Sequence, residues 1–171
     1  MEPSRPTRNN LRLLNAAFVL SGIGTTILGP ILPVLSSHWK MNDAHAGSLF
    51  TAQFLGSALG GLAAGIHPTR SVIVGSLLAA LGLASFTVVH PQAVLPVIFI
   101  YGFGVGLVLT GINLIVSRLA GAARSSALSW LNFCWSLGAT ICPLLAAVFV
   151  VKGDISAFGF SGTPWARAIT L

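Results

Sequence analysis

The sequence predicts an all-α membrane protein built as a bundle of five transmembrane helices. Charge is the first observation: from residue 13 to residue 151 the formally charged residues fall only in short gaps between long uncharged stretches. They are Lys40, Asp43, Arg70, Arg118 and Arg124. Composition is the second: 54% of the residues are hydrophobic and only 7% are charged, against about 25% in ordinary soluble domains. Because hydrocarbon penalises each charge by several kcal/mol, this pattern excludes a soluble fold.

The lengths of the apolar runs define the spans, since about 20 residues at about 1.5 Å each cross a hydrocarbon core of about 30 Å. In chain order, the predicted spans are residues 13–35, 46–66, 71–89, 94–117 and 127–151. Helices are expected because barrel strands would be shorter and would alternate in polarity. We therefore divide the chain into an amino-terminal segment, 1–12, a five-helix bundle, 13–151, and a polar tail, 152–171, that does not span.

The boundaries of these helices follow from local signals. The first run follows a basic segment, as a secretory signal does, but it is long and lacks a cleavage site, so we expect it to remain as a signal anchor. Asn42 or Asp43 caps the second helix by accepting from its free N–H groups. Pro91 divides the long uncharged run because it lacks an N–H and disfavours helix at His90. The short gaps at 67–70 and 90–93 predict that the helices on either side of each gap are antiparallel neighbours.

Cations near the span ends predict the orientation. Arg5, Arg8 and four arginines at span ends fall on one side, and these four are Arg12, Arg70, Arg118 and Arg124. The positive-inside rule places that side, with the amino terminus, in the cytoplasm of a cell whose inner or plasma membrane holds the protein. The carboxyl terminus is then outside. No basic helix face or aromatic-basic pattern indicates nucleic-acid binding.

Small residues in the spans predict close helix packing. Several glycines are four residues apart and stack on one helix face, which permits the close backbone approach that holds helices together in lipid. The residues expected at helix contacts are Gly56, Gly60, Gly61, Gly65, Gly102, Gly106, Gly138 and Pro143.

A weak internal similarity at an offset of about 80 residues suggests a three-helix unit used twice, as in some transporters. Residues 22–24 (GIG) match 102–104 (GFG), and Leu55-Gly56 matches Leu137-Gly138. Chance explains such matches equally well in so biased a composition. The offset would place a sixth helix at 153–171, but Asp154, Pro164 and Arg167 exclude one. The sixth helix is therefore expected to be missing, in a chain that is either naturally short or a truncated gene product.

Polar and aromatic residues inside the spans are the candidates for contact with a solute. They are Thr25, Thr26, Gln53, Tyr101, Asn113, Asn132 and Trp135. Each has a structural alternative, because threonines return hydrogen bonds to their own helix and asparagines join neighbouring helices.

No residue set predicts catalysis. The acidic residues and the four histidines lie outside the spans or at their ends, without metal-ligand spacing, and no glycine-rich phosphate loop follows a strand. We therefore expect no enzyme, no cofactor and no metal.

Three segments give the chain a family resemblance: residues 29–33 (GPILP), 46–56 (AGSLFTAQFLG) and 131–138 (LNFCWSLG), the last followed by Cys142-Pro143. They resemble the first, second and fifth helices of a major facilitator superfamily transporter, particularly its fucose-permease-like branch. The resemblance covers about residues 13–151 and implies the first five helices of that fold. It departs from the pattern at Gly65 and Pro68, where the loop after the second helix carries an aspartate and a glycine in the superfamily.

Two function classes follow. The resemblance implies secondary transport of a small polar solute such as a sugar, by two six-helix halves that alternate access to a central site. The second class is a non-transporting membrane fragment or helix-packing subunit. In either class the partners are membrane lipid and helices supplied by a separate chain or by a homo-oligomer.

Odd numbers of spans place the two ends of a chain on opposite sides of a membrane. We expect Thr163→Cys to react with an impermeant thiol reagent only from outside intact cells. Asp43→Cys is the control for the outer side and Arg70→Cys the control for the cytoplasmic side. Reaction of Thr163→Cys from the cytoplasmic side alone would reveal a sixth crossing or a wrong count of spans.

Overall fold

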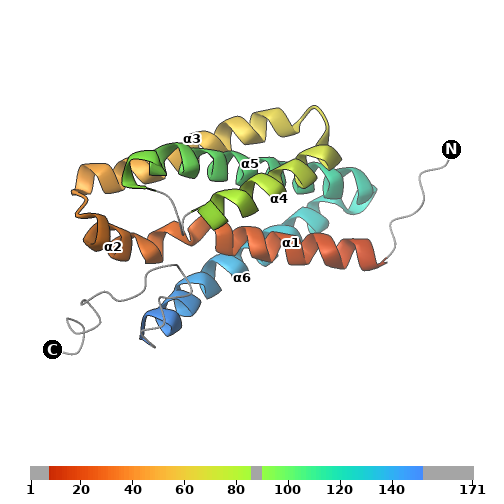
Figure 1. Cartoon of the computed structure of the whole chain (residues 1–171). Coiled ribbons are helices and arrows are strands. Elements are labelled where there is room, and N and C mark those ends of the chain that lie inside the picture. Colours follow the sequence, from red (N-terminus) through yellow and green to blue (C-terminus); the bar gives the residue numbers. More distant parts are fainter. Residues whose placement is uncertain (1–7, 86–89, 152–171) are drawn as a thin grey trace.

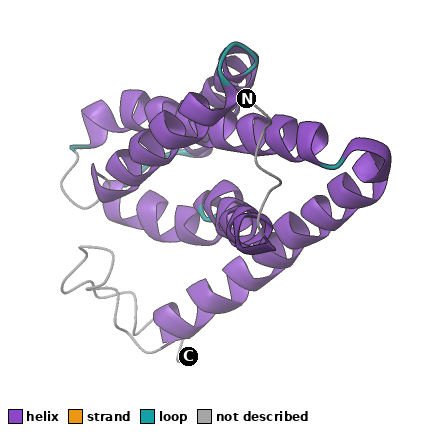
Figure 2. Ribbon diagram, turned by 90° about the vertical axis from the view of Figure 1, so that its right-hand side faces the viewer, coloured by secondary structure: helices purple, strands orange, loops and turns teal. Residues whose placement is uncertain are grey.

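The computed structural model describes residues 8–85 and 90–151, all of them in helices and the short turns between them. The helices are α1 (Arg8–Thr26), α2 (Leu28–Trp39), α3 (Asp43–Ala64), α4 (Pro68–Ser85), α5 (Val94–Leu119) and α6 (Arg124–Val151). Two short 3₁₀ helices, η1 (Pro91–Ala93) and η2 (Gly121–Ala123), precede α5 and α6. The all-α prediction is confirmed (Figure 2). The predicted polar tail, 152–171, lies outside the described residues.

The first predicted span is two helices rather than one. Helix α1 ends at Thr26 and α2 begins at Leu28, with a turn at Ile27 between them. Pro30 explains the position of this break: it has no N–H to give to the carbonyl of Thr26, and it occupies the first turn of α2, where proline is well tolerated. Sequence analysis missed the break because the apolar run continues through it.

Four helical segments of the described chain are long and apolar enough to cross a membrane: Leu11–Ser37, Pro68–Ser85, Val94–Leu119 and Gly121–Val148. Helix α3, the predicted second span, has a span's length but is not among them. Its composition explains this, because Thr51, Gln53, Ser57 and four glycines lower its hydropathy. Helix α3 lies along α5, which is one of the four (Figure 1). The chain is an integral membrane protein.

Three helix pairs make up most of the packing: α3 with α5, α4 with α5, and α1 with α6. Gly102 lies against Gln53 and Gly106 against Ser57, so α3 and α5 run parallel. Gly82 lies against Tyr101 and Gly111 against Pro68, so α4 and α5 run antiparallel. Helices α1 and α6 run parallel, since Phe18 shares a core cluster with Leu131 and, farther along both helices, Gly138 lies against Ile23.

This arrangement brings the four predicted topology arginines to one end of the bundle, the right-hand end in Figure 1. Helices α1, α4 and α6 begin there and α5 ends there. Arg12, Arg70, Arg118 and Arg124 are all exposed. At the opposite end, Asn42 caps α3 by accepting from the backbone N–H of His45 at 2.9 Å, which decides between the two predicted caps.

Most of the glycines predicted at helix contacts lie there. A Cβ on Gly56, Gly60, Gly102, Gly106 or Gly138 would overlap a backbone carbonyl oxygen of the facing helix. A Cβ on Gly61 would lie 3.0 Å from Oγ1 of Thr110. Gly65 and Pro143 make no such contact among the described residues: Gly65 is the exposed carboxyl cap of α3 with no facing helix within 4 Å, and Pro143 is exposed on α6.

The spacing of four residues did not predict other close-packed glycines, because these are seven residues apart. Gly75 and Gly82 on α4 face α5, and Gly104 and Gly111 on α5 face α4. Seven residues are close to two helical turns, so each pair also lies on one face of its helix. A search for this spacing would have found the α4–α5 contact.

The internal similarity has a counterpart in this packing. Gly22 of α1 lies against Trp135 of α6, and its offset match Gly102 of α5 lies against Gln53 of α3. Gly138 of α6 lies against Val19 of α1, and its match Gly56 of α3 lies against Phe99 of α5. The first helix of each proposed unit therefore packs against the second helix of the other.

Glycine at position 56 is expected to be needed for the contact between α3 and α5. Gly56→Leu would force the helices apart, at a cost of about 1–3 kcal/mol in the free energy of unfolding. Gly47→Leu in the same helix is the matched control, because nothing lies within 4 Å of a Cβ there. That control gains helix propensity of about 0.8 kcal/mol. Equal thermal stability of the two variants in detergent would contradict the packing role.

Candidate functional site

Four of the seven solute-contact candidates meet at the break between α1 and α2. We call Thr25, Gln53, Tyr101 and Trp135 the polar cluster; they come from α1, α3, α5 and α6 respectively. Gln53 is 2% exposed and Tyr101 is 3% exposed, so their polar atoms are withdrawn from the surface of the bundle. The cluster therefore connects four helices, α1, α3, α5 and α6, in the apolar interior of the bundle.

Hydrogen bonds from the cluster converge on the last turn of α1. The amide Nε2 of Gln53 donates to the carbonyl oxygen of Thr25 at 2.9 Å, and the hydroxyl of Tyr101 donates to the carbonyl oxygen of Gly24. The last carbonyl groups of a helix have no partner within it, and in hydrocarbon water cannot supply one. Side chains of α3 and α5 therefore satisfy backbone groups that the break leaves available.

The side chain of Thr25 completes the cluster. Its hydroxyl donates to the carbonyl oxygen of Ser21 and accepts from Nε1 of Trp135 at 3.3 Å. Thr25 thus receives hydrogen bonds from both α3 and α6, which fixes the end of α1 between them.

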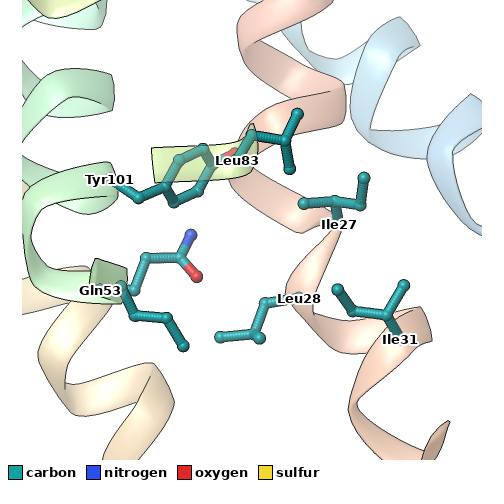
Figure 3. Close-up of a pocket in the computed structure, with 7 residues that line it drawn as sticks. Ile27, Leu28, Ile31, Gln53, Leu83 and Tyr101 are labelled. Carbon is teal, nitrogen blue, oxygen red and sulfur yellow. The ribbon is translucent and has the colours of Figure 1, made fainter. Parts of the chain in front are cut away.

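A small cavity lies beside the cluster (Figure 3). Its lining residues are Ile27, Leu28, Ile31, Gln53, Leu83, Ile98 and Tyr101. The cavity volume is about 10 Å³, close to the minimum that holds one water molecule. In this conformation the cavity does not hold a solute the size of a sugar.

The other three candidates lie elsewhere. Thr26 donates to the carbonyl oxygens of Gly22 and Ile23, at 3.0 and 3.3 Å, which is the structural alternative expected for it. Asn113 donates within its own helix to the carbonyl oxygen of Leu109 at 2.9 Å. Asn132 is exposed on α6. Among the described residues, no three His, Cys, Asp or Glu side chains lie together to hold a metal ion.

Sequence reasoning missed the backbone part of the site. Two acceptors of the cluster are the backbone carbonyl oxygens of Gly24 and Thr25 in α1. Residue type does not indicate whether a backbone carbonyl is free to accept a hydrogen bond from a side chain. Pro30 was the available signal for a break near this site, because it has no N–H to give to the carbonyl of Thr26, the residue after Thr25.

Known proteins resemble this chain over most of its length. The family description of the Major Facilitator Superfamily matches residues 14–166. The chain is 30% identical to "Sodium-dependent glucose transporter 1" of Rattus norvegicus over 140 residues, 78% of this chain and 29% of that protein. It is 28% identical to "Sodium-dependent glucose transporter 1A" of Mus musculus over 137 residues, 77% of this chain and 32% of that protein.

A bacterial protein is similar to about the same degree. The chain is 29% identical to "4-hydroxybenzoate transporter PcaK" of Pseudomonas putida over 148 residues, 82% of this chain and 32% of that protein. The chain thus spans about a third of the length of the curated relatives it matches. No solved structure matches it significantly.

The hydrogen bond from α6 to α1 is expected to contribute to stability. Trp135→Phe removes the Nε1 donor to Thr25 and should lower the free energy of unfolding by about 1 kcal/mol. Trp130→Phe is the matched control on the same helix, because Trp130 is 56% exposed and stacks on Phe133. Thermal denaturation in detergent measures both variants. A loss for Trp130→Phe as large as for Trp135→Phe would show that ring size, not the hydrogen bond, is responsible.

Proposed function

This chain belongs to the major facilitator superfamily, and we propose that it forms the amino-terminal part of a secondary transporter for a small polar solute such as a sugar. The relatives named as glucose and 4-hydroxybenzoate transporters support this proposal. Both named solutes carry hydroxyl groups, which hydrogen-bonding side chains recognise. Nothing in the proposal requires chemistry on the solute, so no enzyme activity is assigned.

The polar cluster at the break in the first span is the observation that carries the proposal. Polar side chains inside a membrane are costly, and where they are kept they often line a solute path. Interrupted membrane helices are tolerated where their free backbone groups are satisfied by neighbours or line a cavity. In our proposal, Thr25, Gln53, Tyr101 and Trp135 form this chain's contribution to the solute site.

Transport by alternating access needs more surface than the described helices provide. The cavity beside the cluster holds about one water molecule, and the chain spans about a third of its relatives. We propose that further helices, from the same polypeptide, a separate chain or a second copy, complete the passage. The exposed Asn132 on α6 is available to face them.

The proposed orientation has the amino terminus in the cytoplasm of the inner or plasma membrane. The gathering of Arg12, Arg70, Arg118 and Arg124 at one end of the bundle supports it, because cytoplasmic loops carry an excess of such residues.

Uptake by cells expressing the complete coding region that contains this chain tests the proposal. The probes are radiolabelled D-glucose and 4-hydroxybenzoate, within a panel of sugars and aromatic acids. We expect uptake of at least one probe, and Tyr101→Phe should reduce it about tenfold while Trp130→Phe leaves it unchanged. A loss of about 1.4 kcal/mol in binding corresponds to that factor.

Vesicles that contain only this chain provide the second arm. Absence of uptake there, together with uptake in the cells, supports a chain that needs further helices. No uptake of any probe in either system, with the protein folded and in the membrane, would contradict transport and favour the non-transporting alternative.

A further inference from the structure

One atom of the polar cluster lacks a partner. Oε1 of Gln53 is buried and accepts no hydrogen bond from any described group. The orientation of this amide is fixed by chemistry, because the carbonyl oxygen of Thr25 can only accept and must therefore face the Nε2 side. The oxygen side of the amide is left on the cavity, which Gln53 lines (Figure 3).

The neighbouring donors of the cluster are already committed. The hydroxyl proton of Tyr101 goes to the carbonyl of Gly24, and that of Thr25 goes to the carbonyl of Ser21. The Nε1 proton of Trp135 goes to Oγ1 of Thr25. Each of these groups has a single proton to give. A donor for Gln53 must therefore come from outside the cluster.

The cavity has the dimensions of one such donor. Its volume is about 10 Å³, which fits one water molecule or one hydroxyl group. Apart from Gln53 and Tyr101, its lining residues are leucine and isoleucine. A purely apolar cavity stays dry, but one with an unsatisfied polar atom binds water where a second polar group is within reach. Tyr101 also lines the cavity, and its phenolic oxygen is the second polar group there.

We propose that Oε1 of Gln53 binds an O–H group in this cavity, with Tyr101 as the second polar contact. Without solute the O–H group belongs to a single water molecule. If the proposed transport function holds, the alternative source is a hydroxyl group of the solute in the same position. The binding chemistry is the same in both cases: an O–H group donates a hydrogen bond to Oε1 of Gln53, and an apolar group of the same size cannot do so.

Radiolytic hydroxyl labelling tests for this site, because a buried side chain is oxidised only where an internal water generates the radical beside it. The experiment uses the purified chain in detergent micelles, with peptide mass spectrometry as the readout. We expect oxidation of Tyr101, and no oxidation of Phe18, an equally buried aromatic ring in the core cluster between α1, α5 and α6.

Variants assign the signal to Gln53. Gln53→Met, which preserves length but removes the acceptor, should abolish the oxidation of Tyr101. Gln92→Met is the control, because Gln92 is exposed in η1 and does not line the cavity. Protection of Phe18 in every variant verifies that the core remains folded. The proposal is overturned if Tyr101 is as protected as Phe18 in the unmodified chain, or if Gln53→Met leaves its oxidation unchanged while Phe18 stays protected.

A solute arm distinguishes the two sources of the O–H group. The labelling is repeated on the complete carrier with saturating D-glucose or 4-hydroxybenzoate. A loss of Tyr101 oxidation assigns the position to a solute hydroxyl in the loaded state; unchanged oxidation assigns it to a resident water molecule. Because labelling without solute does not depend on uptake, a failed transport assay and a failed water site are separate results.

Discussion

Backbone polar groups that lie in hydrocarbon must find partners within the protein, and the arrangement around the first span depends on this constraint. The hydrogen-bond ladder of α1 ends at Thr26, in the middle of a membrane-spanning segment, and Pro30 has no N–H to give to the carbonyl of Thr26. The carbonyl groups of Gly24 and Thr25 are then satisfied by Tyr101 and Gln53 from two other helices. The break between α1 and α2 thus determines where polar side chains of distant helices are needed.

Close glycine packing makes those hydrogen bonds possible. A glutamine or tyrosine side chain reaches the backbone of a neighbouring helix only if the two helices approach closely. Gly56 and Gly102 bring the backbones of α3 and α5 together, and Gly22 and Gly138 do the same for α1 and α6. Since these contacts involve the positions of the internal similarity, both units use the same packing solution, with the first helix of each against the second helix of the other.

The polar cluster combines two roles that are often separate. It stabilises the interrupted span, and it holds the one buried side-chain oxygen without a partner among the described residues, Oε1 of Gln53. The Gln53 amide keeps its Nε2 bond to Thr25 while Oε1 is without a partner. Oε1 is therefore suited to bind and release a hydrogen-bond donor, since the helix contacts stay intact with or without that donor. Membership in a family of carriers gives this incomplete satisfaction a functional interpretation.

The amino-acid sequence alone was enough to predict the membrane environment, the helical class and the approximate positions of the helices, because exclusion of charge from hydrocarbon acts on each segment separately. The spacing of glycines by four also predicted close helix packing. Two of the residues predicted at helix contacts, Gly65 and Pro143, lie on exposed surface. Which polar residues meet depends on how the helices pack. Thr25, Gln53, Tyr101 and Trp135 converge, while Asn113 and Thr26 bond within their own helices. The rotation of each helix about its axis and the break at Ile27 control this outcome, and both depend on contacts between segments far apart in the chain.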